Sequence, residues 1–295
     1  MSINKTVGER LFDALNAIFM IFLMVITIYP FWYVITCSFS DSAYLIGDKG
    51  LMLKSHGFSL VSYDLVFKNP NILTGYINTI IIVAGGTFIN VFMTSIGAFV
   101  LSRRNFAIKK PLMAMILITM YFSGGLIPTF LWINNILGMK NTFWALLLPG
   151  AISTYNLIVM RTNFASIPIS LEEAAKIDGA NDIHVLFKIV LPLSVPIIAV
   201  MTLFYGVGHW NAWFSALIYI RDRSKYPLQL ILREIILLNN TEVMAGDSAS
   251  AVDKFNIGEG IKYATIIVAT VPILCVYPFI QKYFVKGVMV GAIKE

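Results

Sequence analysis

The chain has 295 residues, of which 58% are hydrophobic and 13% charged, and its formal net charge is +6. A soluble domain carries about 25% charged residues, so the composition excludes an ordinary soluble enzyme and indicates a polytopic membrane protein. Basic residues fix the topology of such proteins, so the positive charge does not indicate a nucleic-acid partner. We therefore expect an all-α chain in the cell membrane.

Six apolar segments are long enough, at about 20 residues each, to cross the hydrocarbon core as helices. In chain order they cover residues 14–38, 74–101, 111–133, 142–160, 195–220 and 261–281. The sequence thus predicts one transmembrane domain over residues 1–295, in contact with membrane lipid. A long loop at 221–259 and a tail at 282–295 complete the chain.

The short loop between the second and third segments sets the expected orientation. It contains no acidic side chain and four basic ones: Arg103, Arg104, Lys109 and Lys110. Short loops rich in Lys and Arg stay on the cytoplasmic side of a membrane. Alternation of the spans then places both termini and residues 161–194 in the cytoplasm, and the 221–259 loop outside.

The polar segment 168–192 interrupts the apolar pattern before the fifth span. Ser170 followed by Glu173 predicts a capping box at the start of a helix. The apolar side of this helix should consist of Leu171, Ala174, Ala175 and Ile177. Gly179 should end the helix in the left-handed region, and Asp182 should cap a second helix. Two short helices bent at a glycine indicate a docking element.

The sequence contains no catalytic constellation and no metal-site pattern. The three histidines, His56, His184 and His209, lie in separate regions, without the spacing of zinc ligands. A G-x-x-x-x-G-K-[ST] phosphate loop is also absent from the sequence, so this chain does not hydrolyse ATP by that means. The spans lack the ionisable residues that proton-coupled carriers keep at mid-membrane. We expect no catalytic residue, metal or cofactor in this chain, and an energy source outside it.

Several motifs resemble one transporter family. Glu173-Ala174-Ala175, Asp178-Gly179-Ala180 and Ile189-x-Leu191-Pro192 resemble the EAA loop of binding-protein-dependent ABC importer permeases, which implies a type I, MetI-like fold with six spans. The resemblance is greatest to MalG-type permeases of the carbohydrate-uptake class. Within that class, three motifs resemble the LplC/YtcP branch: Y-F-S-G-G-L-I-P-T (121–129), N-T-F-W-A-L-L-L-P-G (141–150) and G-H-W-N-A-W-F (208–214). That branch implies a complex or uronate-containing oligosaccharide and a Gram-positive bacterium.

The resemblance implies several partners. A second, homologous permease would complete the pore, and an extracellular substrate-binding lipoprotein would deliver the oligosaccharide. Two ATPase subunits, expected as a homodimer, would bind ATP and Mg. The EAA loop would dock in the ATPase cleft, with Glu173 facing a basic residue there. The coupling residues implied are Glu172, Glu173, Ala174, Ala175, Asp178, Gly179, Ala180, Ile189, Leu191 and Pro192.

The resemblance also implies two further contact regions. In MalG-type permeases the loop between the last two spans reaches the binding protein, which implies contacts from Asn239, Asn240, Thr241 and Glu242. The C-terminal tail reaches the ATPase interface, which implies contacts from Lys286, Gly287, Gly291 and Lys294. Glu295 stands where such tails often end in glycine, and this departure leaves the detailed contact of the tail open.

Polar and aromatic residues in two spans are candidates for a substrate pathway. In the fifth span, Trp210, Asn211 and Trp213 combine rings that pack on sugar faces with an amide that pairs with hydroxyls. Trp210 and Trp213 should share a helix face, with Asn211 turned away; anchoring at the membrane interface is the alternative role of these rings. In the second span, Asn90 and Thr94 either line the pore or bond a neighbouring helix.

Other classes of protein remain possible. An ABC importer permease for a non-sugar solute would share the docking segment, whereas a stand-alone carrier or channel would not need it. A membrane-embedded enzyme would need convergent ionisable residues, which the spans lack. Copurification with a second permease and an ATPase would separate the first class from the other two.

Overall fold

The computed structural model describes residues 6–45, 50–103, 106–238, 258–276 and 278. Regular structure in these residues is helical, and one isolated β-bridge joins Ser40 to Phe58. The all-α prediction is confirmed. The chain divides into two compact units: unit 1 comprises Met1–Asn69 and Glu234–Thr270, and unit 2 comprises Pro70–Arg233 and Val271–Glu295.

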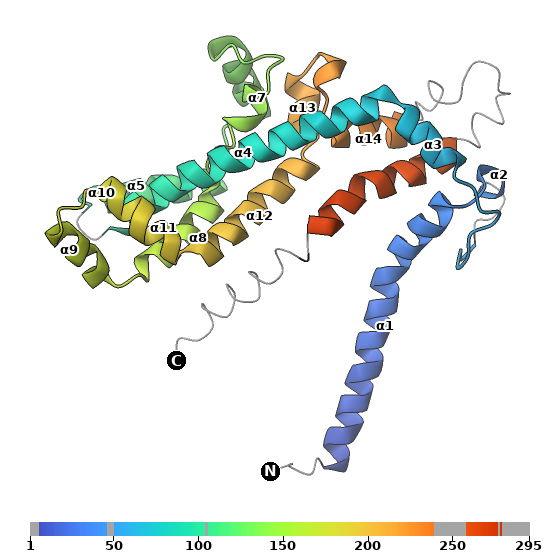
Figure 1. Cartoon of the computed structure of the whole chain (residues 1–295), viewed down its shortest axis with the longest axis horizontal. Coiled ribbons are helices and arrows are strands. Elements are labelled where there is room, and N and C mark those ends of the chain that lie inside the picture. Colours follow the sequence, from blue (N-terminus) through green and yellow to red (C-terminus); the bar gives the residue numbers. More distant parts are fainter. Residues whose placement is uncertain (1–5, 46–49, 104–105, 239–257, 277, 279–295) are drawn as a thin grey trace. The chain divides into compact units, whose positions relative to one another are not determined.

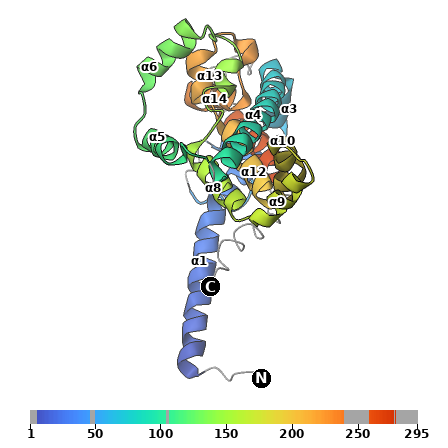
Figure 2. The ribbon, with the colours of Figure 1, turned by 90° about the vertical axis from the view of Figure 1, so that its left-hand side faces the viewer.

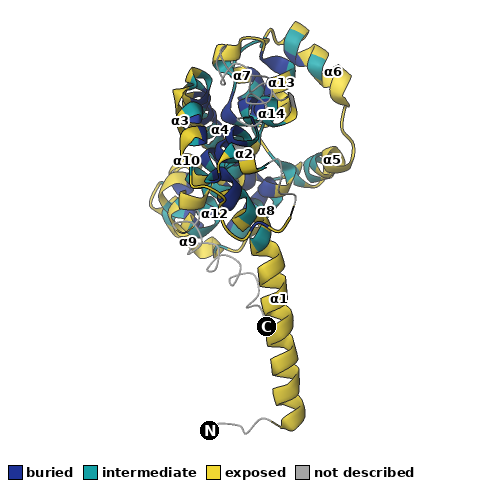
Figure 3. Cartoon of the chain, turned by 90° about the vertical axis from the view of Figure 1, so that its right-hand side faces the viewer, coloured by how far each residue is buried: buried dark blue, intermediate teal, exposed yellow. Residues whose placement is uncertain are grey.

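Unit 1 begins with the long helix α1 (Val7–Ser38), followed by α2 (Ser42–Leu45) and α3 (Val61–Lys68). A capping box starts α1: the Glu9 N–H donates to Thr6 Oγ1 at 3.4 Å, and the Thr6 N–H donates to Glu9 Oε2 at 2.7 Å. Most side chains of α1 are apolar and exposed (Figure 3). Such a surface is suited to contact with lipid or with another membrane helix.

Unit 2 is built on three helices, α4 (Pro70–Ser102), α8 (Thr154–Ala165) and α12 (Val195–Asn211). Both α8 and α12 pack along α4 (Figure 1). Their contact forms a core that includes Ala98, Phe99, Leu157, Met160, Val200 and Met201. Within a bilayer, close packing and interhelical hydrogen bonds hold such helices together, because lipid tails are as apolar as the side chains.

The remaining elements of the described chain surround these helices or connect the two units in sequence. Those that lie wholly in unit 2 are α5 (Lys109–Tyr121), α6 (Leu126–Leu131), η1 (Trp132–Ile136), α7 (Trp144–Leu147), α9 (Ile169–Ile177), α10 (Asp182–Val185), η2 (Leu186–Val190), α11 (Leu191–Leu193), α13 (Phe214–Tyr219) and η3 (Arg223–Lys225). Two helices have residues in both units: α14 (Leu228–Leu238) and a further helix, Gly258–Val276.

Three helices in the described part of the chain are long and apolar enough to cross a membrane: α1, α4 and Gly258–Val276. Two bent pairs bring the number to five if each pair is one span. Lys109–Tyr121 meets Leu126–Ile136 at 110°, and Asp182–Leu193 meets Val195–Asn211 at 86°. Figure 2 shows α5 and α6 diverging from the α4, α8 and α12 bundle. The prediction of six spans is therefore not confirmed.

The fourth predicted span, 142–160, is not one helix. Instead α7 ends at Leu147 and α8 begins at Thr154. Pro149 lies in the intervening turn, and a proline has no N–H with which to continue a helix. The fifth predicted span, 195–220, is also divided, because α12 ends at Asn211 and Ala212 has an extended backbone.

Candidate functional site

The polar segment 168–192 forms two helical pieces joined at Gly179, as predicted. Its first helix, α9, ends at Ile177, and Gly179 has φ of +82°, in the left-handed region that favours glycine. The second piece begins after Asn181, whose side-chain Oδ1 accepts a hydrogen bond from the His184 N–H at 2.8 Å. α10, η2 and α11 then follow one another directly.

The predicted capping box at the start of α9 is wrong. The helix begins at Ile169, so Ser170 already lies inside it and makes no capping hydrogen bond. Pro168 occupies the N-cap position, with φ of −57°. A proline ring fixes φ near this value. Proline also lacks an N–H, but this loses no hydrogen bond here, because the first N–H groups of a helix have no acceptor within the helix. Glu173 therefore has no capping role, and its side chain is exposed.

The predicted cap of the second piece is displaced by one residue. Asn181 is the cap, and Asp182 is the first residue of the helix. A carboxylate in a first turn still interacts favourably with the helix dipole. The same carboxylate pairs with Lys176 of α9, whose Nζ lies 3.0 Å from Asp182 Oδ1. Both side chains are more than half exposed, so this ion pair contributes little stability.

The two faces of α9 differ in exposure. The exposed residues of α9 are Ile169, Ser170, Leu171, Glu173, Ala174, Lys176 and Ile177. On the other face Glu172 is 8% exposed, and Ala175 packs against the core of unit 2 together with Ala180. The predicted apolar side is thus divided, because Ala175 points inward while Ile177 is 86% exposed. The exposed part of α9 is thus largely apolar, and Glu173 is its exposed carboxylate.

The second helical piece is anchored by its large side chains. Val185, Leu186 and Val190 are buried in the core of unit 2. Ile189 and Leu191 of the predicted motif are half-buried beside them, whereas Pro192 is exposed. Gly179 therefore separates an anchored piece from α9, whose inward contacts come from small side chains and from Glu172.

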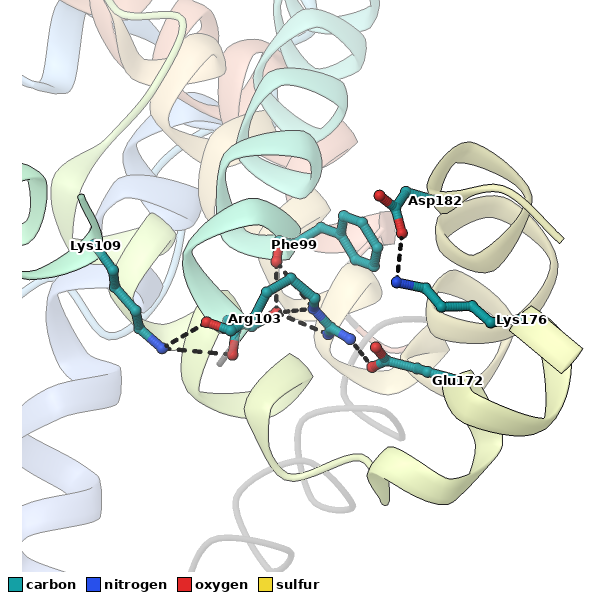
Figure 4. Close-up of polar contacts among 7 residues, drawn as sticks. Phe99, Arg103, Lys109, Glu172, Lys176 and Asp182 are labelled. Carbon is teal, nitrogen blue, oxygen red and sulfur yellow. Dashed lines mark hydrogen bonds and ion pairs between the residues drawn. The ribbon is translucent and has the colours of Figure 1, made fainter. Parts of the chain in front are cut away.

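Glu172 forms an ion pair with Arg103, at the C-terminal end of α4 (Figure 4). The Arg103 side chain is held in place by its other nitrogens: Nε donates to the Phe99 carbonyl at 3.2 Å, and Nη2 donates to Ser102 Oγ at 2.8 Å. The guanidinium also lies 4.5 Å from the centre of the Phe99 ring. Burial lowers the pKa of Arg103, and the carboxylate of Asp182 opposes this change; a guanidinium nonetheless stays charged in proteins.

Two more cations hold the carbonyl groups at this end of α4. The Nε of Arg161, from α8, donates to the Leu101 carbonyl at 3.2 Å. The Nζ of Lys109, from α5, donates to the Arg103 carbonyl at 3.2 Å. Cations at a helix C-terminus satisfy unpaired carbonyls and complement the dipole. Lys109, which was expected to help fix the topology, therefore also joins α5 to α4, and Arg161 joins α8 to α4.

A polar network lies deeper in the core of unit 2. Asn90 is 1% exposed, and its Nδ2 donates to the Gly150 carbonyl at 2.6 Å while its Oδ1 lies 2.6 Å from His209 Nε2. Thr94 is fully buried, and its hydroxyl lies 2.7 Å from the Tyr205 hydroxyl. Both contacts correspond to the alternative in which Asn90 and Thr94 bond neighbouring segments. The sequence did not identify Tyr205 and His209 as their partners, although polar residues in apolar spans are the signal for such bonds.

A cavity of about 960 Å³ lies beside α4 and α12. Its walls come from α4, α12 and residues 272–276, and its lining is mainly apolar. Trp210 is part of this lining, as is Thr87, whose buried hydroxyl has no hydrogen-bond partner among the described residues. The Trp210 ring also lies 6.4 Å from the ring of Tyr76. This volume is within the range of ligand-binding cavities, about 300–1,000 Å³.

The other two residues of the predicted aromatic group lie elsewhere. Trp213 is beyond the end of α12, with the Arg233 guanidinium 4.4 Å from its ring centre. The amide of Asn211 is exposed and donates to the Val207 carbonyl of its own helix at 3.1 Å. The prediction that Trp210 and Trp213 share a helix face is wrong, because the helix stops between them.

Two predicted contact regions lie outside the described residues. They are the loop positions Asn239, Asn240, Thr241 and Glu242, and the tail positions Lys286, Gly287, Gly291 and Lys294. Their roles stay predictions.

Broken apolar helices around a cavity, with an exposed helix at one end, are features of a membrane transport component. The chain belongs to the family described as "Binding-protein-dependent transport system inner membrane component", whose model matches residues 93–290. It is therefore an inner-membrane permease component of that class, as the sequence motifs predicted.

Curated relatives match nearly the full length of the chain. The chain is 41% identical to the "Polygalacturonan/rhamnogalacturonan transport system permease protein YtcP" of Bacillus subtilis (strain 168), over 97% of this chain and 99% of that protein. It is also 41% identical to "Protein LplC" of the same organism, over 99% of this chain and 98% of the relative. The predicted resemblance to this branch is confirmed.

A solved structure shares the fold. It is described as "Crystal structure of a bacterial ABC transporter involved in the import of the acidic polysaccharide alginate". The TM-score is 0.88 at 29% sequence identity, and the match covers 96% of this chain and all of the other. The fold of the described helices is thus that of an ABC transporter subunit.

Proposed function

We propose that this chain is a permease subunit of an ABC importer for an acidic oligosaccharide. It forms the translocation pathway with a second, homologous permease, and an extracellular binding lipoprotein delivers the substrate. Two ATPase subunits, identical to each other, bind ATP and Mg and supply the energy. Polygalacturonan and alginate, which appear in the names of a relative and of the matching structure, are both polymers of uronic acids, and this supports the substrate class.

The outer face of α9 carries this proposal. Leu171 and Ile177 are apolar and exposed, and Glu173 lies between them with its carboxylate free of the predicted cap. A largely apolar surface with an exposed carboxylate is suited to a protein cleft that offers a basic residue, because a charge-assisted hydrogen bond strengthens when water is excluded. We assign this face to the ATPase, and α9 is then the helix through which nucleotide-driven movement reaches the membrane domain.

The orientation of the chain follows from the same assignment. Arg103 lies against Glu172 and the Nζ of Lys109 donates to the Arg103 carbonyl, so these two residues of the basic loop and α9 are on one side of unit 2. A short basic loop stays in the cytoplasm, where the ATPases are. This supports cytoplasmic termini for a multi-pass protein of the cell membrane.

The cavity beside Trp210 is assigned to the substrate pathway. An indole ring packs against the C–H face of a sugar, and the unpaired hydroxyl of Thr87 offers a partner for a substrate hydroxyl. The largely apolar walls bind no part of the substrate tightly. A pathway needs such weak contacts, because its substrate must leave as well as enter.

Reconstitution tests the proposal. The chain is coexpressed with its partner permease and ATPase, purified and incorporated into proteoliposomes with the binding protein outside and ATP inside. We expect all subunits to copurify, and uptake of radiolabelled oligogalacturonate to depend on ATP. Neutral maltooligosaccharides of the same length serve as the control substrate. Uptake of both sugars at equal rates would contradict the acidic substrate, and a chain that purifies alone would contradict the permease assembly.

A further inference from the structure

Several attachments connect α9 to the rest of unit 2, including the chain that leads into it from α8 and the contact of Ala175 with the core. Two of them lead toward the spans that line the cavity. The first is the chain itself, which passes through Gly179 into the anchored piece and on to α12. The second is the ion pair between Glu172 and Arg103, which reaches α4 directly. We infer that Arg103 is a positioning residue that ties α9 to α4, so that movement of α9 displaces α4 and with it one wall of the cavity. The inference rests on the proposed function, since α9 must first receive that movement.

Apolar contacts alone would transmit such movement poorly. The inward face of α9 offers the small side chains of Ala175 and, beyond the bend, Ala180. Small smooth surfaces can slide or separate when a helix is pulled. An ion pair resists both sliding and separation, because either movement takes each charge away from its partner.

The surroundings of the pair strengthen this resistance. The side chains of Arg103 and Glu172 are 22% and 10% exposed, so little water is available to replace either partner. A charge left alone at such a site is strongly destabilising, whereas the intact pair adds little net stability. Buried ion pairs of this kind are best suited to fixing one arrangement of two elements.

The guanidinium fork explains why an arginine stands at this position. Its Nε, Nη1 and Nη2 atoms bind the Phe99 carbonyl, Glu172 and Ser102 Oγ respectively. The contacts to Phe99 and Ser102 fix the side chain to the last turn of α4, while the third nitrogen holds α9. A lysine ammonium is a single point charge on a flexible stem and cannot hold all three groups in this geometry.

The displacement would reach the cavity through α4 itself. Thr87 lies in the cavity wall and belongs to α4, whereas Arg103 directly follows the last residue of this helix. The two residues are 16 positions apart, which corresponds to a distance of about 24 Å along the helix axis at 1.5 Å per residue. Asn90 and Thr94 lie between the two and bond α12 and the Gly150 turn. A continuous helix with fixed side contacts is the kind of rigid element that carries coupling between distant sites.

A double-mutant cycle on the reconstituted transporter tests the inference. The variants are Arg103→Gln, Glu172→Gln and the double variant, and the readout is substrate imported per ATP hydrolysed. We expect each single variant to copurify with its partners and to lower this ratio by about tenfold, a typical coupling between two sites. The double variant should be no worse than either single one, because both changes cut the same connection.

The control is Lys176→Gln. It removes the exposed ion pair of the same helix, and it should leave the ratio unchanged. Arg103→Lys and Glu172→Asp keep both charges and should assemble even where the neutral variants do not. Each should lower the ratio less than its neutral counterpart.

Several outcomes would overturn the inference. A wild-type ratio in Arg103→Gln or Glu172→Gln would do so, as would losses that multiply in the double variant. Failure of all the variants at Arg103 and Glu172 to assemble would assign the pair to folding instead. Failure of the proposed function is distinguishable, because the wild-type chain would then neither copurify with an ATPase nor import substrate.

Discussion

The Nε2 atom of His209 lies 2.6 Å from the Oδ1 atom of Asn90, across 119 positions of the chain. Because Asn90 Nδ2 donates to the Gly150 carbonyl, the amide oxygen must face the histidine, and the imidazole must carry its proton on Nε2. One buried amide therefore joins α4 to α12 and to the turn before α8. These contacts lead to the first two predictions.

Asn90→Ala should destabilise the protein. The substitution leaves the Gly150 carbonyl and the His209 N–H without partners, and an unsatisfied buried group costs about 1–3 kcal/mol. Thermal unfolding of the detergent-purified transporter should show a lower midpoint. Asn211→Ala is the matched control, because that exposed amide bonds a carbonyl of its own helix. An equal shift in both variants would contradict a special role for Asn90.

Gly86→Ala should disturb the same contact by steric overlap. A Cβ at this position would lie 2.4 Å from His209 Nε2, so the imidazole must move away from Asn90. Overpacking of this kind costs about 1–3 kcal/mol. Gly208→Ala on α12 is the control, because a Cβ there meets no atom within 4 Å. The midpoint of thermal unfolding should fall for Gly86→Ala alone, and a fall of the same size in Gly208→Ala would refute the steric explanation.

Glu173→Lys should uncouple ATP hydrolysis from uptake. The residue is on the outer face of α9, so the reversed charge should oppose the basic residue expected in the ATPase cleft without disturbing the core. Removing one partner of a charged interface pair costs about 2–5 kcal/mol, so uptake should fall by about tenfold or more. Uptake and ATPase rates are measured together in proteoliposomes.

Lys188→Glu is the control for this experiment, since Lys188 is exposed on the neighbouring helical piece and its charge is reversed by the same amount. It should retain normal uptake. Normal uptake by Glu173→Lys would remove the docking role from this face of α9.

Trp210→Ala should lower uptake while basal ATP hydrolysis is unchanged. The ring lines the cavity, and loss of an aromatic contact of about 0.5–1.5 kcal/mol corresponds to a decrease of about two- to tenfold. Trp144→Ala on α7 is the control, because that ring is 55% exposed and is not part of the cavity lining. Concentration dependence of uptake is the measurement. Equal effects of the two substitutions would return Trp210 to a packing role.

The sequence was sufficient for features that depend on composition or on local backbone chemistry. Apolar segments without charges predict membrane helices whatever their neighbours are, and Gly179 predicts a bend because few other residues accept its φ. Motif spacing in the 168–192 segment also identified the family before any contact was known.

Features that depend on register or on long-range contacts were missed. The helix α9 starts at Ile169, one residue before the predicted capping box, and long-range contacts decide which of its carboxylates points inward. Glu172 and Glu173 are adjacent and chemically alike, yet one is buried against Arg103 and the other is exposed. A partner 69 positions away, at Arg103, cannot be read from local patterns. Pro149 lies within the fourth predicted span, but helix packing can re-satisfy the backbone around a proline, so its presence alone does not predict the break.

The break at Pro149 and the amide of Asn90 depend on each other. A helix interrupted inside a membrane leaves carbonyl groups to which neither water nor lipid donates a hydrogen bond. The Gly150 carbonyl accepts its hydrogen bond from the Asn90 side chain instead. If a good helix former replaced Pro149 and the helix became continuous, the Gly150 carbonyl would accept a backbone N–H within that helix. The side-chain N–H of Asn90 would then lose its acceptor. The two positions should therefore be exchanged together when such a permease is redesigned, with an apolar residue at 90 wherever the helix at 149 is made continuous.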